Sequence, residues 1–146
     1  MKHPHHVAHD LVLVGGGHAH VEVLHQFAMH RPEGVRLTLI SQDIETPYAG
    51  MLPGYLAGHY QFEDCHVDLS PLAMAAGARL YHSSADGLDL SAGRVLCADR
   101  PSVAFDTVSF DIGSTPARAT IEGHEQALAS KPVRGFLDQW HRVEPD

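Results

Sequence analysis

The hydrophobic pattern near the start of the chain predicts a strand, a tight turn and a helix. Residues 11–14 form an unbroken apolar run, and Gly15-Gly16-Gly17 follow it directly. Apolar residues then recur at helical spacing from Val21 to Ala28, which is typical of a helix that buries one face. We expect this helix to run from about His18 to about Met29, because Arg31-Pro32-Glu33-Gly34 ends it.

The next segments continue the pattern of alternating strands and helices. Residues 35–40 alternate and are rich in β-branched residues, so they predict a second strand, and a right-handed crossover places it parallel to the first. Ser70-Pro71 predicts an N-cap and first helical residue for a helix from Leu72 to Ala76 that stops at Gly77. A third strand is expected from Arg79 to Ala85.

The period then changes to short strands separated by turns. Residues 87–90 and 94–97 flank a turn at 91–93 and predict a hairpin, to which residues 101–105 add a third antiparallel strand. Residues 106–112 form a last strand that runs into a second glycine turn at Gly113. A βαβ unit, a small antiparallel excursion and a return strand together predict an α/β, Rossmann-like domain with a parallel sheet and an antiparallel β-meander.

The Gly15–Gly17 turn is the first candidate for chemistry. Glycines let the backbone approach a pyrophosphate, and the N–H groups and positive dipole end of the following helix face such an anion. Gly15 and Gly17 match the dinucleotide fingerprint GxGxxG, but His20 stands where its third small residue would be. The alternative is a glycine-rich turn that binds nothing.

Two later segments extend the candidate site. The end of the second strand, where an acidic residue often contacts a ribose, holds Ser41-Gln42-Asp43, and a capping or turn role for Ser41 or Asp43 is the alternative. Residues 46–58 interleave proline and glycine with Tyr, Met and Leu, which excludes a long helix or a central strand. Such an apolar loop either lines a pocket for a flat ligand or packs over the core.

Composition narrows the classes of function. The 146 residues suit one domain with a core, and a net charge of −8 without any basic run argues against nucleic-acid binding. No apolar stretch approaches the roughly 20 residues of a membrane helix. Cys65 and Cys97 form no close pair, so we expect reduced thiols and a cytoplasmic protein.

Metal and catalytic motifs are not predicted. The chain has 13 histidines, but they form no HExxH motif and no zinc-finger spacing with cysteine, so we expect solvent-exposed histidines and no bound metal. Asp64, Cys65 and His66 are adjacent, yet adjacency along a chain is not a catalytic geometry. We therefore assign no catalytic residue.

Three segments, taken in order, resemble a known family. They are residues 14–21, residues 46–54, and residues 105–116 with Gly113-Ser114-Thr115-Pro116 at their end. The chain resembles the amino-terminal FAD-binding half of FAD-dependent pyridine nucleotide-disulfide oxidoreductases. Within that family it is most similar to the type II NADH dehydrogenase-like branch that is found fused to selenide, water dikinase.

The resemblance implies a cofactor site and a chemistry. The chain would bind FAD. In the family, NAD(P)H donates a hydride to the flavin, and the flavin passes the electrons to an acceptor. The implied FAD contacts are the pyrophosphate turn, the adenosine ribose, the adenine edge, the isoalloxazine loop and the cofactor's middle. The resemblance implies a pyrophosphate turn of Gly15, Gly16, Gly17, His18 and Ala19, and ribose contacts from Ser41, Gln42 and Asp43. It implies an adenine edge at Ser84 and Ala85, and an isoalloxazine loop with Pro47, Tyr48, Met51 and Leu52. Gly113 would lie at the cofactor's middle.

Departures from the family pattern accompany the resemblance. Besides His20 and Ser41, Asp111-Ile112-Gly113 stands where the family often has Ala-Thr-Gly, and no second GxGxxG unit for NAD(P)H is present. We expect an FAD-binding domain over residues 1–116 and a linker with a helix over 117–146. The chain alone is expected to be inactive, and a partner or a second copy is expected to cover its exposed apolar face. A non-catalytic adenine-nucleotide-binding or interaction module is the alternative.

Overall fold

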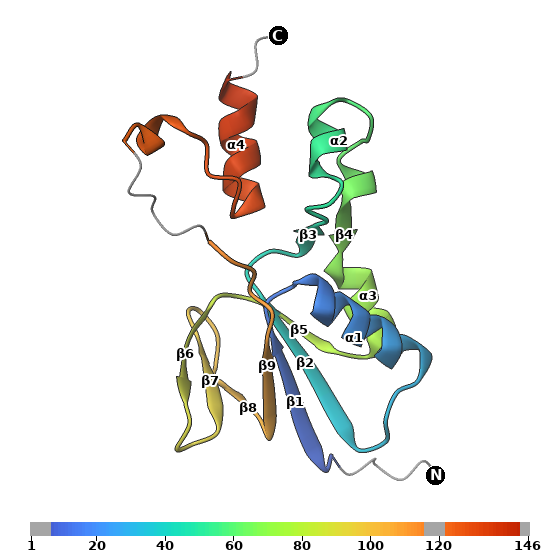
Figure 1. Ribbon diagram of the computed structural model, residues 1–146. Helices are drawn as coiled ribbons and strands as arrows, with labels where there is room; N and C mark the ends of the chain where they lie inside the picture. Colours follow the sequence, from blue (N-terminus) through green and yellow to red (C-terminus); the bar gives the residue numbers. More distant parts are fainter. Residues whose placement is uncertain (1–6, 116–121, 144–146) are drawn as a thin grey trace. The chain divides into compact units, whose positions relative to one another are not determined.

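The computed structural model describes residues 7–115 and 122–143, which fall into two compact units, Met1–Ile112 and Gly113–Asp146 (Figure 1). The domain boundary expected after residue 116 lies outside the described residues. Each unit is a compact body of its own.

A parallel sheet forms the centre of the first unit. Its strand order is β5-β2-β1-β9, with β1 at His9–Val14, β2 at Val35–Ser41, β5 at Arg79–His82 and β9 at Thr107–Phe110. All three pairings are parallel. The predicted α/β class with a parallel sheet is confirmed, and the second strand lies beside the first as expected.

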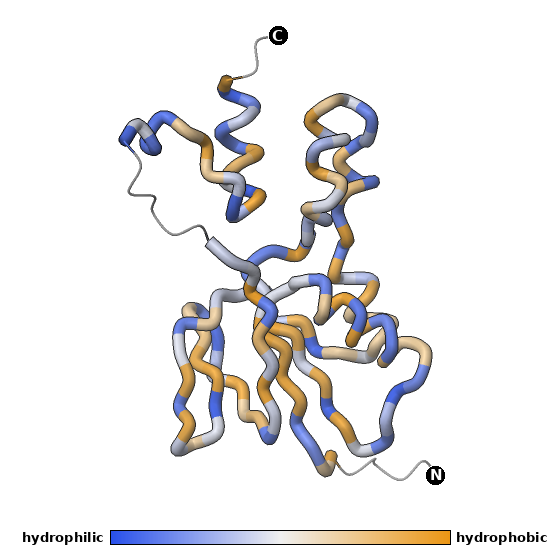
Figure 2. Tube along the Cα trace, viewed as in Figure 1, coloured by the Kyte–Doolittle hydropathy of each residue, from blue (hydrophilic) through white to orange (hydrophobic). Residues whose placement is uncertain are grey.

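Two helices cover one face of this sheet (Figure 1). Helix α1 spans His18–Met29, as predicted, and α3 spans Leu69–Ala76. Alternate strand residues such as Leu13, Leu37 and Leu39 point to this face, because successive side chains of a strand alternate between faces. The central strands are largely hydrophobic along their length (Figure 2).

The start of α3 differs from the prediction. Asp68, rather than Ser70, is the N-cap: its carboxylate accepts a hydrogen bond of 2.8 Å from the backbone N–H of Ser70. The helix therefore begins at Leu69 instead of Leu72, and Pro71 lies within its first turn. Gly77 ends the helix as expected, in a left-handed conformation with φ of 62°.

The opposite face of the sheet carries the predicted meander. It consists of β6 (Ala85–Asp89), β7 (Arg94–Cys97) and β8 (Val103–Ala104), paired antiparallel. Val95 and Val103 of the meander pack with Val12, Val14 and Ile40 of the sheet. The third strand was expected to reach Ala85, but β5 ends at His82, and Ala85 begins β6 because the chain crosses there from the sheet to the meander.

The proline- and glycine-rich segment forms an excursion between β2 and α3. It contains β3 (Glu45–Pro47), α2 (Leu52–Leu56), the 3₁₀ turn η1 (Glu63–Cys65) and β4 (His66–Asp68), with β3 and β4 antiparallel. As expected, it holds no long helix and no strand of the parallel sheet. No residue of α2 is buried, which argues against a loop packed over the core.

The second unit contains two helical segments in its described part. They are the 3₁₀ turn η2 (His124–Gln126) and helix α4 (Val133–Val143), whose buried residue is Leu137. The helix expected near the end of the chain is thus present. Among the residues that the structure describes, no helix is long and apolar enough to span a membrane.

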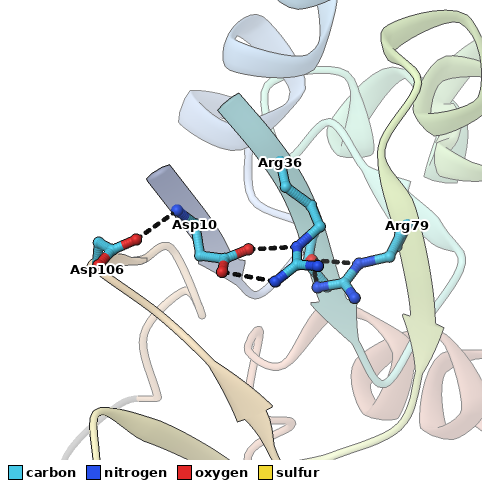
Figure 3. A network of polar contacts seen from close by, with 5 residues as sticks. Asp10, Arg36, Arg79 and Asp106 are labelled. Carbon is cyan, nitrogen blue, oxygen red and sulfur yellow. Dashed lines mark hydrogen bonds and ion pairs between the residues drawn. The ribbon is translucent and has the colours of Figure 1, made fainter. Parts of the chain in front are cut away.

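A charged network lies at the amino edge of the sheet (Figure 3). Asp10 and Arg36 are cross-strand partners, and the guanidinium donates to both carboxylate oxygens at 2.5 and 2.6 Å. The carboxylate of Asp106 accepts a hydrogen bond of 2.6 Å from the N–H of Asp10. Beside them, Arg79 donates to the Thr38 hydroxyl, so the polar edge runs across the sheet.

Candidate functional site

The glycine turn lies at the carboxyl edge of the sheet, between β1 and α1. The N–H of Gly15 donates to the carbonyl of Ile40 at 2.8 Å, which ties the turn to β2. Gly15 has φ of 94°, and a Cβ there would clash with the backbone of Asp111. A Cβ on Gly16 would lie 2.5 Å from Cδ1 of Leu69. The fold itself therefore requires glycine at Gly15 and favours it at Gly16.

His20 occupies the place of the third fingerprint glycine and is almost completely buried, with 2% exposure. Its Nδ1 lies 2.7 Å from the carbonyl oxygen of Gly15, and its Nε2 lies 2.9 Å from Oγ of Ser109. A carbonyl only accepts, so Nδ1 carries the proton, and in the neutral ring the Ser109 hydroxyl donates to Nε2. The expectation of solvent-exposed histidines is wrong for His20, because this side chain joins the turn to β9.

Asp111 supplies an anion at the start of α1. Its carboxylate accepts hydrogen bonds from the N–H groups of Ala19 at 2.9 Å and His20 at 3.4 Å. The backbone carbonyl of Asp111 accepts a hydrogen bond from the N–H of Gly17, the N-cap residue of α1. The Asp111 carboxylate lies so close to Gly17 that a Cβ on Gly17 would clash with it. The helix end predicted to face a pyrophosphate thus already holds a negative group from the chain.

The residues expected near a ribose lie at the end of β2, next to the turn. The buried hydroxyl of Ser41 donates to the carbonyl of Asp43 at 2.5 Å, which is the local turn role that was the alternative. The carbonyl of Gln42 accepts from His82 at 2.9 Å. Gln42 is exposed and Asp43 half-buried. Their contact with a ribose stays a prediction.

The apolar loop approaches the glycine turn through one ring contact. The centroids of the Tyr48 and His18 rings are 5.0 Å apart, and Tyr48 remains 50% exposed. Pro47 ends β3, whereas Met51 and Leu52 lie at the start of α2 and are half-buried. Tyr48 therefore brings the segment predicted for a flat ligand next to the segment predicted for a phosphate.

The remaining expected contacts lie farther along the chain. Ser84 and Ala85 follow β5, where the backbone carbonyl of Ser84 accepts from Ala98. The neighbouring Ser83 is buried and donates to Asp99, which lowers the pKa of that carboxyl. Gly113 has φ of 74° and is the first residue of the second unit. Their roles toward the cofactor also stay predictions.

Cys65 and His66 of the run Asp64-Cys65-His66 pack against their own surroundings. Cys65 is buried, and burial raises the pKa of its thiol, which keeps it protonated and a poor nucleophile. His66 stacks on Phe62 with ring centroids 3.7 Å apart, and its Nδ1 contacts the Phe62 carbonyl. Within residues 7–115 and 122–143, no group of three His, Cys, Asp or Glu side chains could hold a metal ion.

Comparisons with solved structures identify the fold. The chain is similar to the sulfide:quinone oxidoreductase of Aquifex aeolicus, with a TM-score of 0.78 and 20% identity over 93% of this chain and 32% of the other. It is also similar to a chain of the covalent putidaredoxin reductase–putidaredoxin complex, with a TM-score of 0.72 and 16% identity over 96% of this chain and 35% of the other. A third similar structure is the NDH2 of Plasmodium falciparum, with a TM-score of 0.69 and 14% identity over 89% of this chain and 27% of the other.

These neighbours are FAD-dependent pyridine nucleotide-disulfide oxidoreductases. The chain has their fold. It spans about a third of their length or less. No family model and no curated protein matches the sequence. Fusion to selenide, water dikinase stays a prediction from the resemblance.

Proposed function

We propose that the first unit binds FAD and is the flavin-binding portion of a flavin-dependent NAD(P)H oxidoreductase. The observation that carries the proposal is the Gly15–Gly17 turn at the carboxyl edge of a parallel sheet, with Tyr48 of the apolar loop in ring contact with His18. Ligands of open α/β sheets bind at this edge. The likeness to flavoenzymes over 93% of the chain supports the same ligand.

The residues of the turn fit a dinucleotide diphosphate. Gly16 and Gly17 bring bare backbone to the first turn of α1, and the first N–H groups of a helix have no partner within the helix. FAD, when bound, supplies the ring that accepts a hydride. The role of this chain is to hold the diphosphate at α1, to place the ring beside the apolar loop, and to shield it with Tyr48 and Met51.

On our proposal, this chain does not oxidise NAD(P)H by itself. The 146 residues contain one glycine turn of the GxGxxG type and no second one for NAD(P)H. We therefore expect the chain to bind FAD without turning over NADH by itself. An NADH-dependent bleaching of bound flavin by the isolated chain would contradict this expectation.

The first test is a titration with FAD. We would record the visible absorbance of the purified protein and follow added FAD by fluorescence, for the natural chain and for Gly17→Val and Gly87→Val. A valine at Gly17 strikes the Asp111 carboxylate and crowds the start of α1, where we propose that the diphosphate binds, so the Kd should rise at least about tenfold, or about 1.4 kcal/mol. Gly87 lies in β6, where a Cβ meets Cδ1 of Leu96 at an ordinary 3.7 Å, so it is a matched control.

Two results would oppose the proposal. Equal affinities of the two valine variants would make the glycine turn purely architectural. Binding of ADP as tightly as FAD would favour the alternative, an adenine-nucleotide-binding module, because the flavin ring would then add nothing to the affinity.

The first unit exposes apolar side chains near β9 that a partner chain could cover. Phe110 and Ile112 are 50% and 72% exposed, and β9 has β1 as its neighbour in the described part of the sheet. We propose that a second copy or another chain covers this face, since exposed apolar patches favour association. Sedimentation of the natural chain and of Ile112→Ser tests this, and a monomer in both would oppose it.

The cytoplasm remains our proposed compartment. Cys65 and Cys97 are both free thiols in the structure. Free thiols persist in a reducing compartment. Fractionation of cells that carry a tagged chain would test the proposal, and recovery from an extracellular fraction would oppose it.

A further inference from the structure

The anion at the start of α1 is the feature that the proposed function does not absorb. A dinucleotide diphosphate and the Asp111 carboxylate seek the same N–H groups. The carboxylate already accepts from Ala19 at 2.9 Å and contacts the N–H of His20 at 3.4 Å. It is also the group that a Cβ on Gly17 would strike.

The ion pairs of the described residues, 7–115 and 122–143, do not include Asp111. Its stabilising partner is the helix end itself, which favours any anion. A diphosphate that approaches α1 therefore meets a like charge within hydrogen-bonding distance of the N–H groups that it needs.

We propose that Asp111 is a specificity-determining residue, a built-in anion that competes with the dinucleotide diphosphate for the start of α1 and lowers its affinity. This inference rests on the proposed function. Its position favours the role, because the end of β9 and Asp111 are hydrogen-bonded to β1, to the glycine turn and to α1. Asp111 N donates to Val14 O, Asp111 O accepts from Gly17, and Ser109 contacts His20. The carboxylate is therefore held at the turn by the backbone.

The competition predicts a dependence on the charge of the ligand. A ligand with a diphosphate must displace or repel the carboxylate, whereas one without phosphate does not reach it. Removal of the Asp111 charge should tighten FAD and ADP and leave adenosine unchanged. Salt screens exposed charges, so the difference between natural chain and variant should shrink as the salt concentration rises.

The chain offers a matched control for this experiment. Asp106 and Asp111 flank β9 at its two ends, and each carboxylate accepts a hydrogen bond from a backbone N–H of another segment. Asp106→Asn and Asp111→Asn change the net charge equally. Only the second removes charge from the start of α1, so Asp106→Asn separates a local effect from that of the net charge.

The experiment compares the Kd values of FAD, ADP and adenosine for the natural chain, Asp111→Asn, Asp111→Ala and Asp106→Asn, with the Tm of each. We expect both Asp111 variants to bind FAD and ADP more tightly by on the order of tenfold at low salt. Adenosine and the Asp106→Asn variant should show no change. Asparagine keeps an oxygen that accepts from the Ala19 N–H, so Asp111→Asn should remain folded even if Asp111→Ala does not.

The outcomes separate the two proposals. Equal or weaker FAD binding by a folded Asp111→Asn would overturn the role of Asp111 and leave FAD binding intact. No FAD binding by the natural chain or by either Asp111 variant would overturn the proposed function, and the present inference with it. Tighter binding that equally affects adenosine would also overturn the inference, because it would not act through phosphate.

Discussion

The two ends of β9 hold the same side chain in different surroundings. At the amino edge, Asp106 accepts from the backbone of Asp10, which is paired with Arg36. At the carboxyl edge, Asp111 accepts from the backbone of Ala19 with no basic side chain of the described residues bound to it. At the amino edge the ion pair with Arg36 compensates the charge of Asp10, beside Asp106, whereas no ion pair of the described residues lies at Asp111. We expect the first arrangement to contribute mainly to stability, and we proposed above that the second affects ligand affinity.

The largest expected effect tests whether the carboxyl edge also carries stability. His20→Ala removes a buried ring and leaves the Gly15 carbonyl and the Ser109 hydroxyl without their partner. We expect a loss of about 2–4 kcal/mol in the free energy of unfolding, measured by urea denaturation. His18→Ala, an exposed neighbour, should stay within about 0.5 kcal/mol. Equal stability of the two variants would make His20 dispensable.

A smaller loss is expected at the amino edge. Asp10→Ala breaks the ion pair with Arg36, whose side chain is 42% exposed and can regain water. We expect a loss of about 1 kcal/mol, and a double-mutant cycle with Arg36→Ala should give a coupling of roughly 0.5–1 kcal/mol. The exposed pair of Glu22 and His25 is the control, and Glu22→Ala should change little. A coupling near zero would remove the stabilising role of this edge.

The pH dependence sharpens the same contrast. The hydrogen bonds from Arg36 hold the pKa of Asp10 below its ordinary value of about 4. A carboxyl with a lowered folded-state pKa contributes its stability above the unfolded pKa and loses it as the pH falls through the folded pKa. The stability difference between the natural chain and Asp10→Asn should therefore be constant near neutral pH and shrink below about pH 4. A difference that grows on acidification would contradict this assignment.

The smallest expected effect concerns the stability of Asp111→Asn. Asparagine still accepts from the Ala19 N–H, and only the attraction between charge and helix dipole is lost, about 0.3–1 kcal/mol. Asp106→Asn should be similar in size. The comparison is sharpest if Asp111→Asn barely changes the urea midpoint while it changes the Kd of FAD. A loss above about 2 kcal/mol would make Asp111 mainly a structural cap.

Local pattern was enough to predict the parallel sheet and the pairing of its second strand with its first. Residues 35–40 have the apolar content of a buried strand, and a right-handed crossover leaves little choice for their direction. The left-handed Gly77 likewise ends α3 where its sequence predicts. These features depend on residues within a few positions of one another, which is why one sequence suffices for them.

The contacts that shape the candidate site join distant segments and were missed for that reason. His20 meets Ser109 across 89 positions, and Ala19 meets Asp111 across 92. In the sequence, Asp111 was merely a departure from a family pattern, and His20 one of 13 histidines. The available signal was an acidic residue near the end of the last expected strand, two positions before Gly113. Asp68 was missed locally, because Ser70-Pro71 is an equally good helix start.

The pairing of β1 with both β2 and β9 has a consequence for the order of folding. Leu11 pairs with Leu37 in one strand and with Thr107 in the other, so the second pairing closes a far longer loop. Long loops close late, and we expect mutations in β9 to give φ-values near zero while those in β2 give high ones. The strand that completes the sheet also delivers Asp111, so the start of α1 is open to a solution anion until the last step of assembly.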